Sequence, residues 1–297
     1  MLGIINLYKP VGKTSHDMVY FIRKTLGIKK VGHTGTLDPC AEGVLPVLVG
    51  RATALSDFLM AGDKVYTATV KLGIKTDTYD TTGTVLETND VFVSLDDIEN
   101  ALESFKGEIE QEPPMYSAIK IGGKKLYHLA REGKEIERPK RKITIYDISV
   151  FDFDKENNEF KMRVHCSKGT YIRSLCHDLG NVLGCGASME ALVRNKTGIF
   201  EDSGAYTCEM IKTAVKNGDL SFLTPPDKVL EEFPAITVDD ETSKKIQNGI
   251  MLRTNQLKIN PEVNDRIRIY DKERFLCLVK IVESEGSKCI KIDMGFY

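Results

Sequence analysis

One stretch of the chain, from Gly32 to Pro46, gathers several side chains that could do chemistry, among them a single aspartate, Asp38. The stretch is rich in glycine, threonine and proline, and an Asp-Pro pair such as Asp38-Pro39 usually marks a turn. No Gly-Lys-Ser/Thr sequence follows, so the stretch is not a phosphate-binding P-loop, and it does not match a zinc motif. Two interpretations are open here: a plain turn, or a loop that presents one carboxylate.

A second acidic pair, Asp77 and Asp80, resembles half of a metal site. The two residues lie three positions apart in a turn rich in threonine and glycine. Short carboxylates in such turns more often accept hydrogen bonds from backbone N–H groups or hold a basic partner. We therefore expect capping or ion pairing from this pair, and we predict no metal site in the chain.

Positive charge is concentrated in one part of the chain. The formal net charge is −2, so any attraction to RNA must be local. Nine basic residues lie close together, at Lys120, Lys124, Lys125, Arg131, Lys134, Arg138, Lys140, Arg141 and Lys142. Only three acids offset them, at Glu132, Glu135 and Glu137. Such a run can be a solvated face, but aromatic rings at Tyr116, Tyr127 and His128 could stack on unpaired bases. We predict that residues 105–142, called the basic segment below, contact RNA.

The bulk composition is that of a soluble globular protein. Hydrophobic residues make up 41% of the chain and charged residues 28%. No apolar run approaches the roughly 20 residues that span a bilayer, and the N-terminus has no export signal. The seven cysteines never occur as Cys-x-x-Cys, so we expect neither a disulfide framework nor a zinc site. These features favour the cytoplasm.

The elements on either side of Asp38 can be predicted from local signals. Residues 2–7 alternate as a strand, and Thr14 with Asp17 forms a capping box that opens a helix. That helix is expected to stop at Gly27. Residues 28–43 are predicted to be loop, followed by a buried strand over 44–49. Pro46 inside this strand predicts an edge or bulge position.

The remaining patterns predict a mixed α+β fold with a largely antiparallel sheet. Strands are expected over residues 64–73, 143–153 and 159–166, and helices over 94–105 and 170–180. Prolines punctuate the chain near residue 230. Beyond them we predict a short helix starting at Asp239 and two or three strands between 266 and 293. The expected domains are residues 1–233, which include the basic segment, and a small β-rich module over 234–297.

Several blocks of sequence together resemble one family. The blocks are Lys9-Pro10-x-Gly12-x-Thr14-Ser15, Gly32-His-Thr-Gly-Thr-Leu-Asp38-Pro-x-Ala-x-Gly-Val-Leu-Pro46, Leu72-Gly73-x-x-Thr76-Asp77-Thr78-x-Asp80-x-x-Gly83, Gln111-x-Pro113-Pro114-x-Tyr116-Ser117-Ala118-x-Lys120, Gly123-Lys124-x-Leu126-Tyr127-x-x-Ala130-Arg131, Ser167-Lys168-Gly169-Thr170-Tyr171-Ile172-Arg173-Ser174-Leu175 and Leu192-Val193-Arg194-x-x-x-Gly198-x-Phe200. They occur in order and at the family's spacing, and they resemble the TruB-type tRNA pseudouridine-55 synthases. That family's last block often reads Leu-Arg-Arg-Thr, whereas this chain has Leu192-Val193-Arg194-Asn195.

The resemblance implies an isomerase whose catalytic carboxylate is Asp38. The reaction breaks the glycosidic bond of a flipped-out uridine and rejoins the same uracil through C5, so it needs no redox step, metal or cofactor. It needs a nucleophilic or electrostatic group at the junction of sugar and base. Attack on the ribose, attack on the ring and assisted elimination all remain open as routes.

The resemblance also assigns Arg173 and Tyr66 to the catalytic site. Arg173 is expected to pair with Asp38 and to stay protonated. The sequence adds a hint of its own, because Lys168 and Arg173 fall at or before the first turn of a predicted helix, where the helix dipole disfavours positive charge. An unfavourably placed cation often has a tertiary partner. Tyr66 matches the family tyrosine that packs against the flipped uracil and relays its C5 proton.

Further positions match residues that bind the substrate in this family. His33 is expected to fill the gap that the extruded base leaves, since unstacking a base costs free energy. Tyr171 and Leu192 are expected to line the base pocket, and Lys9 and Lys120 to contact the substrate. The implied partner is the T stem-loop of tRNA, with no obligate protein partner, no membrane and a monomeric chain. The C-terminal module weakly resembles a PUA-like RNA-binding domain.

A different class of function fits the same scaffold. A non-catalytic protein that binds or folds tRNA would show the basic segment and the same fold, but it would have no need for Asp38, Tyr66 and Arg173 together. The presence of all three favours the enzyme.

Overall fold

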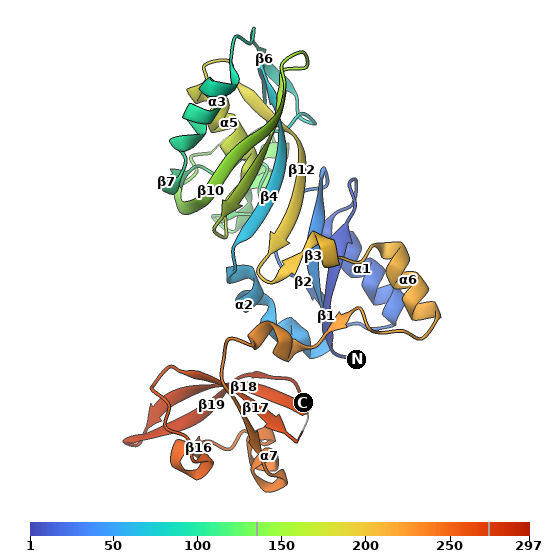
Figure 1. Ribbon diagram of the computed structural model, residues 1–297, viewed down its shortest axis with the longest axis vertical. Helices are drawn as coiled ribbons and strands as arrows, with labels where there is room; N and C mark the ends of the chain where they lie inside the picture. Colours follow the sequence, from blue (N-terminus) through green and yellow to red (C-terminus); the bar gives the residue numbers. More distant parts are fainter. Residues whose placement is uncertain (135, 273) are drawn as a thin grey trace.

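The computed structural model describes residues 1–134, 136–272 and 274–297, together with the side chains of these residues except Lys125. Glu135, one of the acids that offset the basic segment, therefore lies outside the described residues. The described chain contains two main sheets with helices packed on the larger one (Figure 1). No helix in these three ranges is long and apolar enough to cross a membrane.

The larger sheet has ten strands and forms the body of the protein. Along the sheet the strands are β14 (Leu223–Thr224), β1 (Gly3–Lys9), β3 (Ala41–Val49), β12 (Ala187–Thr197), β4 (Lys64–Leu72), β11 (Glu159–Cys166), β10 (Arg141–Asp154) and β7 (Gly107–Gln111). Two short strands pair beside this path, β2 (Val31–His33) on β3 and β13 (Phe200–Glu201) on β12. Every pairing is antiparallel except that of β12 with β3. The predicted α+β class with a largely antiparallel sheet is confirmed.

Helices cover the two halves of this sheet separately (Figure 1). Helix α1 (Ser15–Leu26) and helix α6 (Cys208–Lys216) lie beside β1 to β3, whereas α3 (Leu95–Glu103) and α5 (Ile172–Val182) lie beside β10 and β12. Short helices η1 (Gly50–Leu55) and α2 (Ser56–Ala61) follow β3, and two further turns, η2 (Asp202–Gly204) and η3 (Pro226–Leu230), follow β13 and β14.

The predicted helix signals operate as expected. Thr14 and Asp17 form a reciprocal capping box at the start of α1, and Gly27 ends that helix in the left-handed conformation. Ser94 caps α3 in the same way. The apolar stripe of α5 is buried, including Leu175, so this helix is fixed against the sheet by its hydrophobic face.

Two predictions around residues 28–49 are wrong. The expected loop contains β2, and β3 already begins at Ala41. Pro46 lies in an interior strand, because β3 pairs with β1 on one side and with β12 and β2 on the other. On that second side β12 pairs only with residues 41–43 and β2 only with 47–49. Pro46 therefore falls in the gap between two partners, where its missing N–H breaks no strand pairing.

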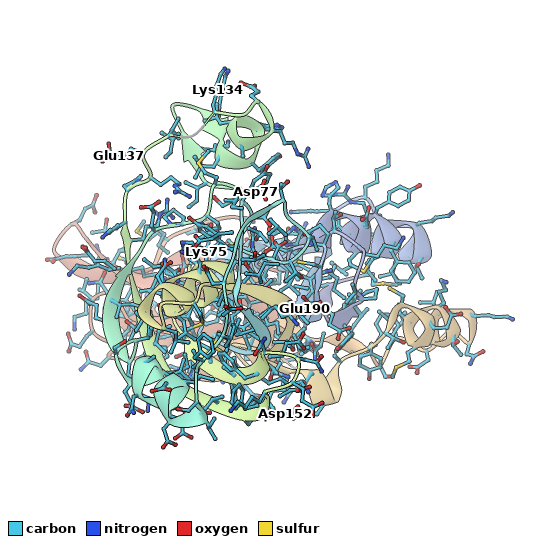
Figure 2. The ribbon with its side chains drawn as sticks, turned by 90° about the horizontal axis from the view of Figure 1, so that it is seen from above. Lys75, Asp77, Lys134, Glu137, Asp152 and Glu190 are labelled. Carbon is cyan, nitrogen blue, oxygen red and sulfur yellow. The ribbon has the colours of Figure 1, made fainter. Side chains whose placement is uncertain are left out.

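The basic segment projects from the larger sheet. It includes β7, a small hairpin of β8 (Lys120–Ile121) and β9 (Lys124–Lys125), and α4 (Leu126–Arg131). Figure 2 shows Lys134 at its outer end. A second two-stranded hairpin, β5 (Ile74–Thr76) with β6 (Val85–Thr88), carries the turn with Asp77 and Asp80.

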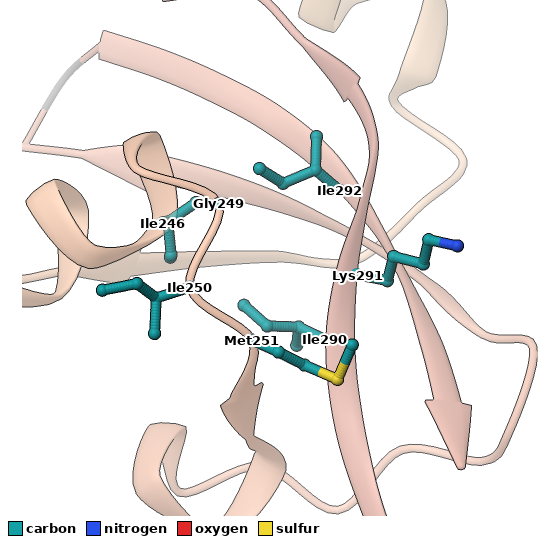
Figure 3. A pocket seen from close by; sticks show the side chains of 7 residues that line it. All are labelled: Ile246, Gly249, Ile250, Met251, Ile290, Lys291 and Ile292. Atoms are coloured by element: carbon teal, nitrogen blue, oxygen red, sulfur yellow. The ribbon is translucent and has the colours of Figure 1, made fainter. Parts of the chain in front are cut away.

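The C-terminal part forms a separate five-stranded sheet. Its strands are β15 (Ala235–Val238), β17 (Arg266–Asp271), β18 (Arg274–Ser284), β19 (Ser287–Gly295) and β16 (Leu252–Arg253), with α7 (Asp240–Gln247) and η4 (Thr254–Leu257). Ile246, Ile250 and Met251 line an apolar pocket against β19 (Figure 3). Leu278 of β18 and Phe296, the residue after β19, pack into one apolar cluster with residues of β1 and β3. This part of the chain is thus anchored to the first sheet.

Candidate active site

Asp38 lies in the loop between β2 and β3, and this loop is held from both ends. The Leu37 N–H donates to Ser15 Oγ at the start of α1, 2.9 Å away. The Gly12 N–H donates to the carbonyl of Pro39 (2.8 Å), and the Ala41 N–H donates to the carbonyl of Asp38 (3.1 Å). The Asp38 side chain is 36% exposed. The loop therefore presents one carboxylate to solvent from a fixed backbone.

Arg173, the second residue of α5, makes the expected ion pair with this carboxylate. Its Nε lies 2.9 Å from Asp38 Oδ2, and its side chain is only 6% exposed. Nη1 donates to the carbonyl of Thr78 (3.1 Å), and Nη2 donates to that of Tyr116 (2.8 Å). A buried guanidinium with this many partners has one orientation, so it fixes the direction of the Asp38 side chain.

Asp80 supplies a second carboxylate to Arg173. Its Oδ2 lies 3.5 Å from Nη1 of Arg173, and its side chain is 7% exposed. Its Oδ1 accepts hydrogen bonds from the Thr78 hydroxyl (2.9 Å) and from the Thr82 N–H (3.1 Å). Asp77 accepts from the Thr84 N–H at 2.8 Å. The predicted capping and ion pairing of this acidic pair is confirmed, and the described parts of the chain hold no cluster of metal-ligating side chains.

Tyr66 lies on β4, two strands away from β3, with Arg194 of β12 directly across from it. Its side chain is buried, and the guanidinium of Arg194 lies close enough to act on the phenol. Burial raises the pKa of Tyr66, the guanidinium of Arg194 opposes this rise, and the charge of Asp38 adds to it. The phenol is therefore neutral at pH 7, with a cation beside its oxygen.

Two further predicted residues, Tyr171 and Leu192, lie around these groups. The backbone of Tyr171 is clamped by the Gln111 amide, which accepts from its N–H (2.8 Å) and donates to its carbonyl (3.0 Å). Burial raises the pKa of Tyr171, and the charge of Asp38 contributes to this rise. Leu192 of β12 is buried, in register with Ala41 of β3. These contacts place both side chains near the Asp38 loop.

His33 ends β2 and carries a neutral ring. Its side chain is half-buried, and its Nδ1 is buried without a hydrogen-bond partner. Burial lowers its pKa, and the nearby charges of Arg194 and His16 lower it further. An uncharged ring at this position suits stacking better than ion pairing.

The two predicted lysines differ in their surroundings. Lys9 is fully buried, and its ammonium donates to the carbonyls of Pro10 (3.0 Å) and Lys13 (2.6 Å). We therefore no longer expect Lys9 to contact RNA, because it has no exposed surface. Its hydrogen bonds instead stabilise the turn before α1. Lys120 is exposed on β8 and remains available to a ligand.

The sequence did not point to two residues that shape this site. Arg194 was visible only as part of a motif that departs from the family pattern, yet it is almost fully buried beside Tyr66. Gln111 was part of a matching block without an assigned role, and it fixes the residue before α5. Asn195, which stands where the family often has threonine, accepts a hydrogen bond from the Thr67 hydroxyl (2.8 Å) and donates one to the Asp202 carboxylate (2.8 Å).

Two family models cover most of the chain. Residues 23–172 match the N-terminal domain of the TruB family of pseudouridylate synthases. Residues 173–231 match the C-terminal domain of tRNA pseudouridylate synthase B. The join between the two matches falls inside α5, so it does not mark a structural boundary.

Relatives and solved structures agree with these matches. The chain is 46% identical to tRNA pseudouridine synthase B of Clostridium tetani, over 98% of this chain and 99% of the relative. It is 47% identical to the protein of the same name from Clostridium novyi, over 98% and 99%. A chain in a crystal structure of a Cbf5-Nop10-Gar1 complex superposes with a TM-score of 0.71 at 28% identity, over 99% of this chain and 84% of that one. A chain in an H/ACA RNP bound to a substrate RNA containing 2'-deoxyuridine gives 0.69 at 27% identity, over 98% and 83%. The chain belongs to the TruB family of pseudouridylate synthases.

Proposed function

We propose that this protein is an isomerase that converts the T-loop uridine of tRNA, position 55, into pseudouridine, with Asp38 as its catalytic carboxylate. One observation carries the proposal. A partly exposed carboxylate is held by a buried arginine whose two other nitrogens donate to backbone carbonyls, so its position is set before a substrate arrives.

The chemistry needs little beyond this arrangement. The C1′–N1 bond of the uridine breaks and a C1′–C5 bond forms, while C5 loses a proton and N1 gains one. No electrons are exchanged with another molecule. Asp38 acts at the sugar–base junction as nucleophile or as electrostatic partner, and Tyr66 lies close enough to feel its charge.

Base flipping is part of the proposal. A uridine stacked inside a tRNA loop cannot reach a carboxylate that is flanked by protein on several sides, so the base must leave its stack. Tyr171 and Leu192 would line the pocket for this base, and the neutral ring of His33 would occupy the space that it leaves.

The substrate assignment to tRNA is supported by the names of the relatives and by the local charge. Curated relatives at 46–47% identity are named tRNA pseudouridine synthase B. We propose that the basic segment contacts the phosphates of the T stem-loop, with the β-rich module over residues 234–297 extending the contact. One chain carries the candidate catalytic residues and the basic segment, so we expect it to act as a monomer without a protein partner.

The direct test uses an unmodified tRNA transcript and the purified protein. We expect one pseudouridine per tRNA, at the T-loop uridine, and none in a transcript with cytidine at that position. Mapping pseudouridine in cells that lack the protein should show loss of the same modification. Tight tRNA binding without product would instead support the non-catalytic alternative, and product at another position would overturn the assigned site.

A further inference from the structure

We propose that Arg194 is a positioning residue of this active site, which holds the Tyr66 hydroxyl and the loop that leads to Asp38 in their working places. The inference rests on the proposed function, because it assigns a task within the same reaction. It concerns a residue of the last sequence block, on β12 two positions after Leu192.

Arg194 is a buried cation of an uncommon kind. The residue is 1% exposed, and within the described ranges no carboxylate lies at ion-pair distance from it. Its guanidinium donates instead to the carbonyls of Val44 (2.7 Å) and Gly35 (3.1 Å). The residue also lies directly across from the buried Tyr66 of β4. Burial of a charge without a counter-ion is costly, so such a residue needs a compensating purpose.

The backbone explains how the side chain reaches this place. Arg194 pairs with Tyr66 of β4 on one side and with Gly43 of β3 on the other. A side chain on Gly43 would lie 2.3 Å from the Arg194 carbonyl oxygen, so only glycine permits this close approach of the strands. Immediately after Arg194 the pairing with β4 shifts register, and such irregularities redirect side chains.

The guanidinium reaches the stretch of β3 that lies between its pairings with β12 and with β2. Val44 follows the last residue of β3 that pairs with β12, and its carbonyl oxygen receives the Nε of Arg194. The bond to Gly35 ties in the loop between His33 and Asp38. The side chain of Arg194 thus connects β12 to the loop that carries Asp38, through Gly35, and to the strand that follows this loop, through Val44.

The position of Arg194 across from Tyr66 links it to chemistry. In a proton relay the Tyr66 O–H gives up its own proton before its oxygen takes the one that leaves C5, so negative charge develops on that oxygen and the neighbouring guanidinium stabilises it. Burial lowers the pKa of the nearby His33 ring, and the charge of Arg194 adds to this lowering. A merely structural arginine would serve the two carbonyls and have no effect on Tyr66.

A double-mutant cycle separates these two roles. Single-turnover rates and tRNA affinity are measured for the wild type, Arg194→Gln, Tyr66→Phe and the double variant. We expect Arg194→Gln to slow turnover by about 100-fold, as for the loss of a preorganised donor, with tRNA affinity little changed. In the Tyr66→Phe background the same substitution should cost far less, because its partner oxygen is gone. Equal losses in both backgrounds would overturn the proposal.

A second measurement does not depend on turnover. With carbon-13-labelled tyrosine, the Cζ resonance of Tyr66, identified by its loss in Tyr66→Phe, should move in Arg194→Gln and move less in Arg194→Lys. An unmoved resonance would overturn the positioning role. If Arg194→Gln fails to fold, the Lys variant carries both measurements. Failure of the proposed function would appear separately, as a wild-type protein that makes no pseudouridine.

Discussion

The Asp38 site and the basic segment hold charge in opposite ways. At the site, Arg173 is 6% exposed and touches two carboxylates, and its donors are fixed by backbone carbonyls. In the basic segment Lys134 is 61% exposed and pairs with a neighbouring glutamate, and Lys120 is exposed as well. Among the basic side chains of the segment that the structure describes, Arg138 is the exception, since it is buried against Pro113 and Glu112 at the base.

This difference separates two tasks. Buried charges with fixed partners are little screened by salt and keep one geometry, which suits the alignment of a reacting group. Exposed charges on flexible stems attract phosphate over a distance and lose strength as salt rises. Substitutions in the first region should therefore change the rate of the chemical step, and those in the second should change affinity.

The largest effect that would sharpen this contrast is expected at Arg173. Arg173→Lys keeps the charge but loses the planar fork, so turnover should fall by about 100- to 1,000-fold with little change in tRNA affinity. Arg173→Met should also lower the free energy of unfolding by about 3 kcal/mol, because Asp80 is left buried without its cation. Denaturant unfolding and single-turnover assays measure both.

Arg163, an exposed arginine on β11, provides the control. Arg163→Met removes the same charge and should leave turnover and stability nearly unchanged. If Arg173→Lys kept full activity, the fixed geometry of the Asp38 carboxylate would not matter, and the contrast between the two regions would break down.

The second prediction concerns exposed charges of the basic segment. We expect replacement of Lys120, Lys124 and Lys140 by alanine to weaken tRNA binding and to reduce the slope of log affinity against log salt by about 2 to 3. Turnover of bound tRNA should be almost unaffected. Lys142 is left out of this variant, because its ammonium already pairs with the Glu108 carboxylate at 2.9 Å.

A control variant with alanine at Lys155, Lys161 and Lys216 changes the net charge equally, on the β10–β11 hairpin and at the end of α6. It should retain the wild-type salt slope. An identical slope in both triple variants would mean that the basic segment is only a solvated face.

The smallest effect is expected where the two regions meet, at Asp178 of α5. Burial, with repulsion from Glu112, raises its pKa to about 6, and Lys140 opposes this. Above that pH the folded protein must hold a partly buried charge that the unfolded chain carries in water, so stability is reduced there. The penalty disappears as the pH falls below 3.8, the ordinary pKa of an aspartate side chain, because both states are then protonated.

Asp178→Asn should therefore raise the free energy of unfolding at pH 7 by about 1 kcal/mol, allowing for partial solvent screening. The gain should be much smaller at pH 4. Denaturant unfolding at both pH values, with the exposed Asp147→Asn as control, measures it. A gain of the same size at both pH values would show that the ionisation of Asp178 is not its cause.

Much of the fold could be predicted because its signals are local. The capping boxes at Thr14 and Ser94 and the alternation of β4, β10 and β11 depend on residues close in sequence. Pro46 was misplaced at an edge because its strand partners come from two distant segments, one of them about 150 residues further along. Local patterns contain no information about such partners.

In the candidate site, too, some residues could be predicted from the sequence and others could not. The resemblance and the helix-dipole argument both pointed to Arg173, whose pairing with Asp38 the structure contains. Lys9 was misjudged because its burial depends on how the turn before α1 folds back over it. Arg194 escaped notice because its importance comes from cross-strand packing between β3, β12 and β4, which no single block of sequence reveals.

The most direct test of the central claim is the conversion of Asp38 to asparagine, which removes the charge and keeps the volume. In single turnover on unmodified tRNA, Asp38→Asn should form pseudouridine more than about 1,000-fold more slowly than the wild type, with tRNA affinity nearly intact. The exposed Asp90→Asn serves as control. Undiminished pseudouridine formation by Asp38→Asn would contradict the account.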